Sequence, residues 1–307
     1  MDRSFIKATE IWEPDRDKEK LSIVSGHYGS FDEFEDHSKT MTFDYDEGLP
    51  GKAWAQKHPI ILTSLEGSYF KRTEMANKIG ITTAIAMPIF AGEYLHAVVV
   101  FLCGDKGDYA GAIELWSSDK ERRNEMGLAQ GYYGSMKDFE WISKNVKIMR
   151  GHGLPGTVWA EKMPFIMSNL DDSSTFLRAK KAQKEGITTV LGIPAWMREE
   201  DGYVMAFLSA KGTPIARRFE IWIPDDTGEA LIFRDGHCDE GVDLSSLYAL
   251  TRLEKHSTTL GKVWKTGFPI LTSKFNLGEE DHTNFSSLLA IPILQNGFCK
   301  SVVAFYS

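Results

Sequence analysis

The chain contains the segment Gly48-Leu49-Pro50-Gly51-Lys52-Ala53-Trp54, and Pro59-Ile60-Ile61 follows it closely. A similar segment, Gly153-Leu154-Pro155-Gly156-Thr157-Val158-Trp159, lies 105 residues further on, and a weaker copy places Trp264 another 105 residues later. This interval has the length of a whole domain and far exceeds the ~20–50-residue period of a solenoid. The sequence therefore predicts three domains, at residues 1–105, 106–211 and 212–307.

The composition is that of an ordinary globular protein, with 42% hydrophobic and 25% charged residues in a chain of 307. A net charge of -8 and a pI near 5.6 argue against nucleic acid or a membrane as a partner. No apolar run reaches the ~18 residues of a spanning helix, and the first residues lack the apolar core of a signal peptide. The three cysteines, Cys103, Cys238 and Cys299, are far apart and do not suggest a disulfide framework. We expect a cytoplasmic protein.

Each copy opens with a strand that ends in tryptophan, at Glu10-Ile11-Trp12, Glu114-Leu115-Trp116 and Glu220-Ile221-Trp222. A polar turn and a second strand complete a hairpin, and a short helical segment follows. The Gly-Leu-Pro-Gly step starts a helix that carries the recurring tryptophan, because proline is tolerated in a first helical turn. Turn geometry explains this step better than anion binding, since the lysine and glycine spacing of a phosphate loop are missing.

The second half of each unit contains a strand that begins with proline, a helix and two apolar strands. We expect the helices at about residues 68–78 and 174–184, with Ser173 or Ser174 as an N-cap and Gly80 and Gly186 as C-caps. The fold class predicted for each domain is α+β, with an antiparallel sheet of five or six strands and helices inserted mid-chain. The helices cover one face of the sheet and leave the other face free to pack.

This order of signals resembles the GAF domain, a sensory relative of the PAS fold. In copy one the resemblance is carried by Gly-Leu-Pro-Gly-x-x-Trp, Pro59-Ile60, Phe70-Lys71-Arg72, Ala76, Gly80, Met87-Pro88 and the closing Val-Val-Phe strand. In copy two it is carried by Phe176-Leu177-Arg178, Ala182, Gly186, Ile193-Pro194 and Ala206-Phe207. The resemblance covers essentially the whole chain and implies three tandem GAF/PAS-like domains.

The third copy departs from the pattern. Thr258-Thr259-Leu260 replaces Gly-Leu-Pro, and the interval from Pro269 to Pro292 is shorter than its counterparts in the other copies. We expect this copy to be degenerate and to lack the helix before its last two strands. The short links between copies, such as Lys211-Gly212-Thr213-Pro214, are predicted to be loops and not the long signalling helices that usually flank GAF domains.

GAF-like domains bind a small molecule between the sheet and the mid-chain helices. The resemblance implies a ligand site lined by Trp54, Phe70, Arg72, Ile79 and Thr82 in copy one, and by Trp159, Phe176, Arg178, Ile187 and Thr188 in copy two. An arginine can clamp a carboxylate or phosphate, and an aromatic face can stack on a planar ring. The alternative is that the aromatic residues are core and the arginines are solvated helix residues.

The sequence gives little support for catalysis. His237 and Cys238 are adjacent, but neighbours on a strand point to opposite faces of the sheet. Some GAF relatives reduce free methionine sulfoxide with pocket cysteines, and others attach a bilin to a cysteine, but neither placement is matched here. The eight histidines do not cluster at metal-ligand spacing, so no metal site is expected.

The leading hypothesis is a small-molecule-sensing or signalling protein of tandem GAF-like domains, without its own catalytic output. The first alternative is a protein–protein interaction scaffold whose pockets are filled by their own side chains. The second is a sulfoxide-reductase-type enzyme. The expected partners are an unidentified small molecule, a protein that carries the output and a second copy of the chain. The sequence names no cofactor.

Overall fold

The computed structural model describes residues 4–104, 109–118, 124–168, 170, 176–195, 202–277 and 285–307. Repeat one consists of β1 (Ile6–Pro14), β2 (Lys20–His27), α1 (Asp32–Lys39), β3 (Thr42–Asp44), α2 (Gly48–Gln56), β4 (Ile60–Leu62), α3 (Thr73–Lys78), β5 (Thr83–Ala91) and β6 (Tyr94–Cys103). Repeat two consists of β7 (Ala112–Ser118), β8 (Glu125–Tyr132), α4 (Lys137–Asn145), β9 (Lys147–Met149), α5 (Gly153–Glu161), β10 (Phe165–Met167), α6 (Ala179–Lys184), β11 (Ile187–Pro194) and β12 (Tyr203–Ala210). Repeat three consists of β13 (Arg218–Pro224), β14 (Ala230–Cys238), α7 (Leu244–Leu247), β15 (Arg252–Glu254), α8 (Thr259–Thr266), β16 (Ile270–Thr272), β17 (Leu288–Gln295) and β18 (Phe298–Tyr306).

Each repeat forms one six-stranded antiparallel sheet. The strand orders are β3-β2-β1-β6-β5-β4, β10-β11-β12-β7-β8-β9 and β15-β14-β13-β18-β17-β16, which are the same order once the second is read from its other edge. The first and last strands of a repeat are therefore neighbours in the middle of its sheet. The predicted α+β fold of three antiparallel sheets with helices inserted mid-chain is confirmed.

The central strands are buried on both faces, which explains their sequences. Along β1, Ile11 faces the centre of the molecule, whereas its neighbour Trp12 faces the helices, because successive side chains of a strand alternate. In β6, residues 97–103 are all buried and form the unbroken apolar run that two covered faces require.

The glycine that ends the Gly-Leu-Pro-Gly step has a steric role that all three repeats share. A Cβ atom at Gly51, Gly156 or Gly261 would lie 2.2, 2.1 or 2.0 Å from a main-chain oxygen of the third strand or its end. The first glycine has a different role, since Gly48 and Gly153 adopt a positive φ of 58° at the first residue of α2 and α5. Only the steric requirement persists in repeat three, where Thr258 takes the place of the first glycine.

The helices predicted at about residues 68–78 and 174–184 are shorter than expected. In repeat one the chain before α3 is a turn, in which the Ser68 hydroxyl donates to the Leu65 carbonyl and accepts from the Phe70 N–H. In repeat two, Ser173 and Ser174 lie outside the described residues, and α6 begins after Arg178. Gly80 and Gly186 follow these helices with positive φ angles of 79° and 76°, as predicted for C-terminal glycines.

The described residues before the last two strands of repeat three differ from their counterparts in the other repeats. Within the described residues between β16 and β17, which are 273–277 and 285–287, there is no helix. Residues 211–217, which link β12 to β13, also contain no helix, and the same holds for the described residues 104 and 109–111 of the first link. The domain boundaries at residues 105 and 211 stay a prediction.

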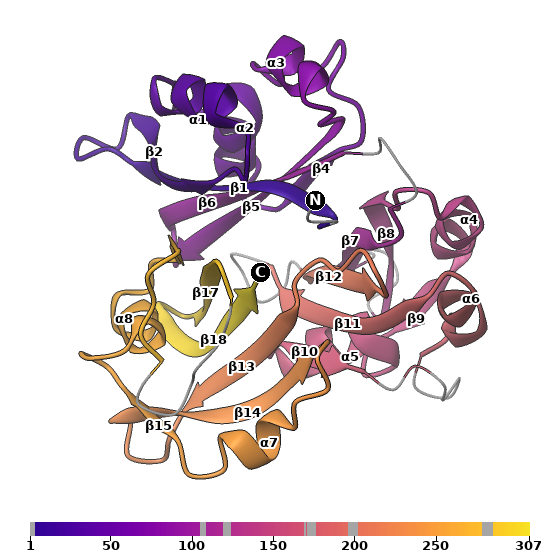
Figure 1. Cartoon of the computed structure of the whole chain (residues 1–307), viewed down its shortest axis with the longest axis vertical. Coiled ribbons are helices and arrows are strands. Elements are labelled where there is room, and N and C mark those ends of the chain that lie inside the picture. The colour runs from indigo at the N-terminus through magenta and orange to yellow at the C-terminus, as the bar shows by residue number, and fades with distance from the viewer. Residues whose placement is uncertain are drawn as a thin grey trace.

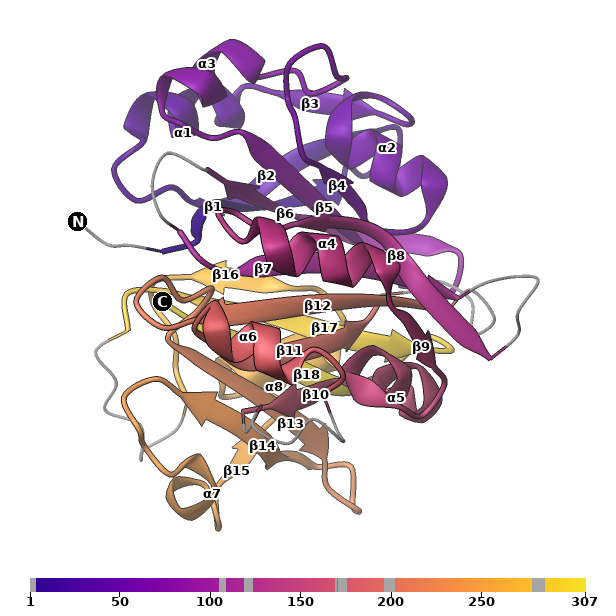
Figure 2. The same ribbon diagram turned by 90° about the vertical axis from the view of Figure 1, so that its right-hand side faces the viewer.

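The three sheets pack their free faces against one another around a common core, and the helices lie on the outside (Figure 1). Phe101, Phe207 and Phe305 from the three closing strands meet there, with ring centroids 5.5, 5.3 and 6.4 Å apart. The ring of repeats is closed, because β4 contacts β8, β10 contacts β14 and β16 contacts β2. Figure 2 shows the same closure from the side of repeat two. No described helix is long and apolar enough to cross a membrane.

Candidate functional site

A buried carboxylate lies at the centre of repeat one, between the sheet and the helices. Glu10 on β1 is fully buried, and Arg72, just before α3, forms two hydrogen bonds with it, one of them from Nη2 to Oε2 at 2.8 Å. Trp12 Nε1 and the Tyr28 hydroxyl donate to the same carboxylate at 2.9 Å each. Every acceptor position of Glu10 is thus served by a side chain of its own repeat.

The electrostatics of this pair follow from its surroundings. Burial alone would raise the pKa of Glu10, but the Arg72 guanidinium and the hydrogen bonds from Trp12 and Tyr28 outweigh burial and lower that pKa. Arg72 also donates to the Ser38 hydroxyl at 2.6 Å, and Ser38 in turn donates to the Phe34 carbonyl. The ion pair is therefore charged and anchored to α1 as well as to β1.

Aromatic rings enclose the Arg72 guanidinium. Its central carbon lies 4.8 Å from the ring centroid of Phe34, 5.3 Å from that of Phe70 and 5.7 Å from that of Trp12. Arg72 is 3% exposed, so water does not compete for it. Guanidinium groups stack well on aromatic faces, and burial strengthens the contact.

Repeat two contains the same arrangement. Glu114 on β7 accepts two hydrogen bonds from Arg178, with Nη2 to Oε2 at 2.9 Å, and one each from Trp116 and Tyr133 at 2.9 Å. Arg178 Nη1 also donates to the Ser143 hydroxyl at 2.5 Å. The guanidinium lies 4.8, 5.1 and 5.3 Å from the ring centroids of Phe139, Trp116 and Phe176.

Repeat three keeps the carboxylate but changes its cation. Glu220 on β13 accepts from Trp222 Nε1 and from the Tyr306 hydroxyl at 2.8 Å each. Its guanidinium comes from Arg218 on the same strand, whose Nε lies 2.6 Å from Glu220 Oε1. Arg218 also donates to the Tyr248 hydroxyl. The buried Glu-x-Trp pair is therefore common to all three repeats, whereas the arginine is not.

Comparison with known proteins agrees with this architecture. Residues 8–118 match the sequence pattern of the family described as the GAF domain. The chain consists of three tandem GAF-like repeats. GAF domains are typically ligand-sensing or regulatory modules.

Solved GAF structures resemble one repeat each. The GAF domain of A. aeolicus nlh2 is 22% identical, with a TM-score of 0.27, and the match covers 33% of this chain and 60% of that one. The free methionine-R-sulfoxide reductase of Neisseria meningitidis is 11% identical, with a TM-score of 0.26 and coverage of 32% and 52%. The second GAF domain of DevS from Mycobacterium smegmatis is 18% identical, with a TM-score of 0.25 and coverage of 33% and 64%. This chain thus spans little more than half the length of the first of these structures, and no curated protein matches it.

The predicted GAF ligand residues of repeat one separate into two groups. Phe70 and Arg72 come together around Glu10, as described above. Trp54 instead packs edge-to-face against Tyr45, with ring centroids 5.2 Å apart. Ile79 follows α3 and lines a different cavity, and the buried Thr82 hydroxyl has no hydrogen-bond partner among the described residues.

The predicted residues of repeat two separate in a similar way. Phe176 and Arg178 lie around Glu114, whereas the Trp159 ring is covered by Arg150, whose guanidinium carbon is 5.2 Å from the ring centroid. Ile187 is part of the core between sheet and helices. The Thr188 hydroxyl donates to the Ser209 carbonyl at 3.4 Å.

The sequence analysis missed the partners of the two arginines, which are Glu10, Trp12, Tyr28 and Ser38 in repeat one and Glu114, Trp116, Tyr133 and Ser143 in repeat two. A signal was present, because Glu-x-Trp recurs in three otherwise apolar opening strands. A glutamate at the same place in every copy of a buried strand indicates a neutralised internal charge.

A hollow within repeat one borders the network around Arg72. The hollow nearest the predicted pocket of repeat one has a volume of about 310 Å³, and Phe70, Lys52 and Lys71 contribute to its lining. Lys52 pairs with Asp46 at 2.9 Å, and Lys71 pairs with Glu47 at 3.1 Å. The cations beside this hollow are thus already neutralised on the surface.

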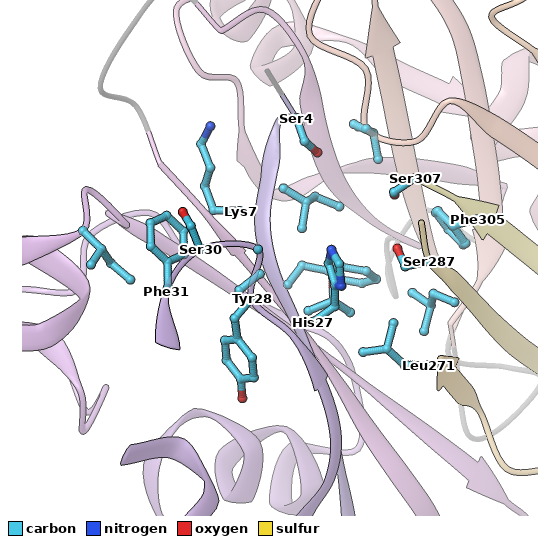
Figure 3. A pocket seen from close by; sticks show the side chains of 18 of the residues that line it. Ser4, Lys7, His27, Tyr28, Ser30, Phe31, Leu271, Ser287, Phe305 and Ser307 are labelled. Atoms are coloured by element: carbon cyan, nitrogen blue, oxygen red, sulfur yellow. The ribbon is translucent and has the colours of Figure 1, made fainter. Parts of the chain in front are cut away.

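A larger cavity, of about 670 Å³, lies between repeats one and three (Figure 3). His27, Ser287, Leu271 and Phe305 gather on one side of β1, while Lys7 and Phe31 lie on its other side. The sequence analysis did not anticipate this cavity, because it depends on how the repeats pack and not on any one repeat.

Burial disfavours the thiolate form of two of the cysteines. Burial raises the pKa of the Cys103 thiol well above its ordinary value and raises that of Cys299 to about 12. The three cysteines are unpaired. The part of the chain that the structure describes contains no group of three or more His, Cys, Asp or Glu side chains that could hold a metal ion.

Proposed function

We propose that the chain is a non-catalytic regulatory protein whose GAF-like repeats have filled their own ligand pockets and act together as one closed body. The observation that carries this proposal is the pairing of Arg72 with Glu10 and of Arg178 with Glu114. These are the arginines that a bound carboxylate or phosphate would need. In each repeat an internal glutamate already occupies them in a two-point contact.

This proposal favours the scaffold alternative over a sensor that binds its ligand inside repeats one and two. A ligand anion would have to displace a buried carboxylate that accepts four hydrogen bonds, and would leave that carboxylate without its cation. With the pockets filled, regulation runs through contacts with a partner protein or a second copy of the chain. We propose that the protein is located in the cytoplasm.

The proposal that the protein is non-catalytic is supported by its thiols. A cysteine that attacks a sulfoxide must reach the thiolate form, and burial opposes this form at Cys103 and Cys299. We therefore expect no reduction of free methionine sulfoxide by the purified protein. Turnover that is lost in a Cys103→Ser or Cys299→Ser variant would contradict this expectation.

Native mass spectrometry, before and after mild denaturation, tests the filled pockets. We expect the mass of the polypeptide alone from wild type, and the same spectrum reports its oligomeric state. The control is the double variant Glu10→Leu/Arg72→Met, in which no internal charge remains in repeat one. An added mass that is present in wild type and absent from this variant, or from the matched Glu114→Leu/Arg178→Met variant, would overturn the proposal.

A further inference from the structure

The three clefts between repeats differ at two positions that the strand pairing makes equivalent. Thr9 of β1, Ile113 of β7 and Phe219 of β13 each pair with the central phenylalanine of the closing strand. On their other side they pair with His27, Tyr132 and His237, respectively. Repeat one therefore presents a threonine and a histidine where repeat two presents an isoleucine and a tyrosine.

The side chains that precede these strands accentuate the difference. Phe5, Tyr109 and Ile215 each lie four residues before the Thr9, Ile113 and Phe219 position. Phe5 is fully buried, and its ring packs at a tilt of 39° against Tyr132 of repeat two, with a centroid distance of 5.3 Å. The smaller Ile215 lines the cleft between repeats three and one instead. With Thr9, His27 and Ile215 at these three positions, the cavity of about 670 Å³ stays open at this cleft.

The residues that line the cavity include basic side chains but no acidic ones. Lys7 and His27 are basic, and no aspartate or glutamate is among the lining residues, although the chain carries a net charge of -8. The His27 side chain makes no hydrogen bond or ion pair with any described residue. Lys7 has no carboxylate partner in the described chain and rests on the Tyr109 ring, 3.9 Å from its centroid. The ring nitrogens of His27 are therefore available to an anion in the cavity.

The side of the cavity that contains His27 is otherwise largely apolar. Phe305, Leu289 and Leu271 of repeat three line the cavity, with Phe101 of repeat one beside them. The Ser287 hydroxyl lies among these side chains, on the same side as His27 (Figure 3). Small-molecule sites combine such an apolar wall with a few polar groups, in cavities of roughly 300–1,000 Å³.

We propose that the cleft between repeats one and three binds a small carboxylic acid with an apolar body. His27 holds the carboxylate beside the Ser287 hydroxyl, which lies on the same side of β1, and the phenylalanine and leucine side chains of repeat three cover the apolar part. This site is separate from the filled pockets inside the repeats, so the inference goes beyond the proposed function and stands or falls independently of it.

Isothermal titration calorimetry with octanoate, below its micellar concentration, tests the site, with octanol as the neutral counterpart. We expect saturable binding of octanoate by wild type and much weaker binding of octanol. His27→Phe keeps the bulk of the ring and removes its hydrogen bond to the carboxylate, which is expected to weaken binding about tenfold or more. His237→Phe, at the equivalent position of repeat three and outside the cavity, is expected to bind octanoate as wild type does.

A second variant closes the cavity with residues that the protein already uses elsewhere. Thr9→Ile/His27→Tyr gives repeat one the side chains of repeat two and is expected to abolish binding without lowering the melting temperature. If wild type fails to bind octanoate, if octanol binds as tightly, or if His27→Phe binds as wild type does, the inference is wrong.

Discussion

Repeats one and three neutralise the buried glutamate of their first strand in different ways. In repeat one the glutamate of the first strand is neutralised by Arg72, which comes from the mid-chain helix region 62 residues away. In repeat three the cation is Arg218, two residues before Glu220 on the same strand. The described residues between β16 and β17 contain no helix that would supply an arginine.

The difference teaches which part of the arrangement the fold requires. A buried carboxylate costs several kcal/mol unless a cation and hydrogen-bond donors compensate it. Glu220 is neutralised by Arg218 of its own strand and does not depend on an arginine from a helix. We infer that the carboxylate and its tryptophan donor belong to the packing of the sheet, and that the source of the cation is free to change.

The largest expected effect comes from removing the cation. Arg72→Met leaves Glu10 charged and buried, which is expected to lower the free energy of unfolding by about 3–5 kcal/mol. Arg218→Met is expected to cost less, because the 2.6 Å approach of Arg218 Nε to Glu220 Oε1 lacks hydrogen-bond geometry, whereas Arg72 forms two hydrogen bonds with Glu10. Urea unfolding followed by circular dichroism measures both.

Two controls separate charge from packing in this experiment. Glu10→Leu/Arg72→Met removes both charges and is expected to recover most of the lost free energy. Arg72→Ala is expected to regain stability when methylguanidinium is added, since the cage of Phe34, Phe70 and Trp12 can hold that ion. Equal losses in Arg72→Met and the double variant would show that packing, and not the buried charge, decides the effect.

Lowering the pH perturbs the same ion pair by protonating Glu10. The folded-state pKa of Glu10 lies below its ordinary value of 4.5, so its contribution to stability is fully present above that pH. The contribution is lost as the pH falls from about 4.5 through the lowered folded pKa. We expect the unfolding free energy of wild type to fall over this range more steeply than that of Glu10→Leu/Arg72→Met. Parallel pH profiles for the two proteins would rule out a charged Glu10 in the folded state.

A smaller effect should distinguish the tyrosine donors. Tyr28→Phe and Tyr306→Phe each remove one hydrogen bond to a buried carboxylate, which is expected to cost about 1.5–3 kcal/mol. Tyr306→Phe should be the more harmful, since the contact of Arg218 Nε with Glu220 Oε1 lacks hydrogen-bond geometry, whereas Glu10 keeps two hydrogen bonds from Arg72. The difference is read from urea midpoints at constant slope, and a larger loss in Tyr28→Phe would contradict it.

The sequence predicted the fold well because its signals are local. Strand alternation, the proline-initiated strands and the glycines at 80 and 186 act within a few residues, and each was repeated along the chain. The helices predicted before Gly80 and Gly186 were too long by several residues. A serine that turns the chain and a serine that caps a helix use the same hydroxyl chemistry.

The candidate site was predicted only in part, for a physical reason. Arg72 and Phe70 do meet, but the anion that they meet is Glu10, and contacts across 62 residues leave no local pattern. The position of Trp54 could not be derived either, because its neighbour Tyr45 depends on how β3 meets α2. The cleft between repeats one and three depends on the packing of whole sheets, which a single repeat does not encode.

The smallest effect concerns the helix that carries the recurring tryptophan. Helix α8 starts one residue later, relative to its tryptophan, than α2 and α5, and the Thr258 hydroxyl accepts a hydrogen bond from the Gly261 N–H at 3.0 Å. The N-cap residue His152 of α5 makes no such bond. Thr258→Ala is therefore expected to cost about 1 kcal/mol, whereas His152→Ala should stay within about 0.5 kcal/mol of wild type. Thermal melts of both variants test whether repeat three replaced a glycine that turns the chain with a threonine that caps the helix. Equal melting temperatures for Thr258→Ala and wild type would mean that this hydroxyl adds nothing to the stability of α8.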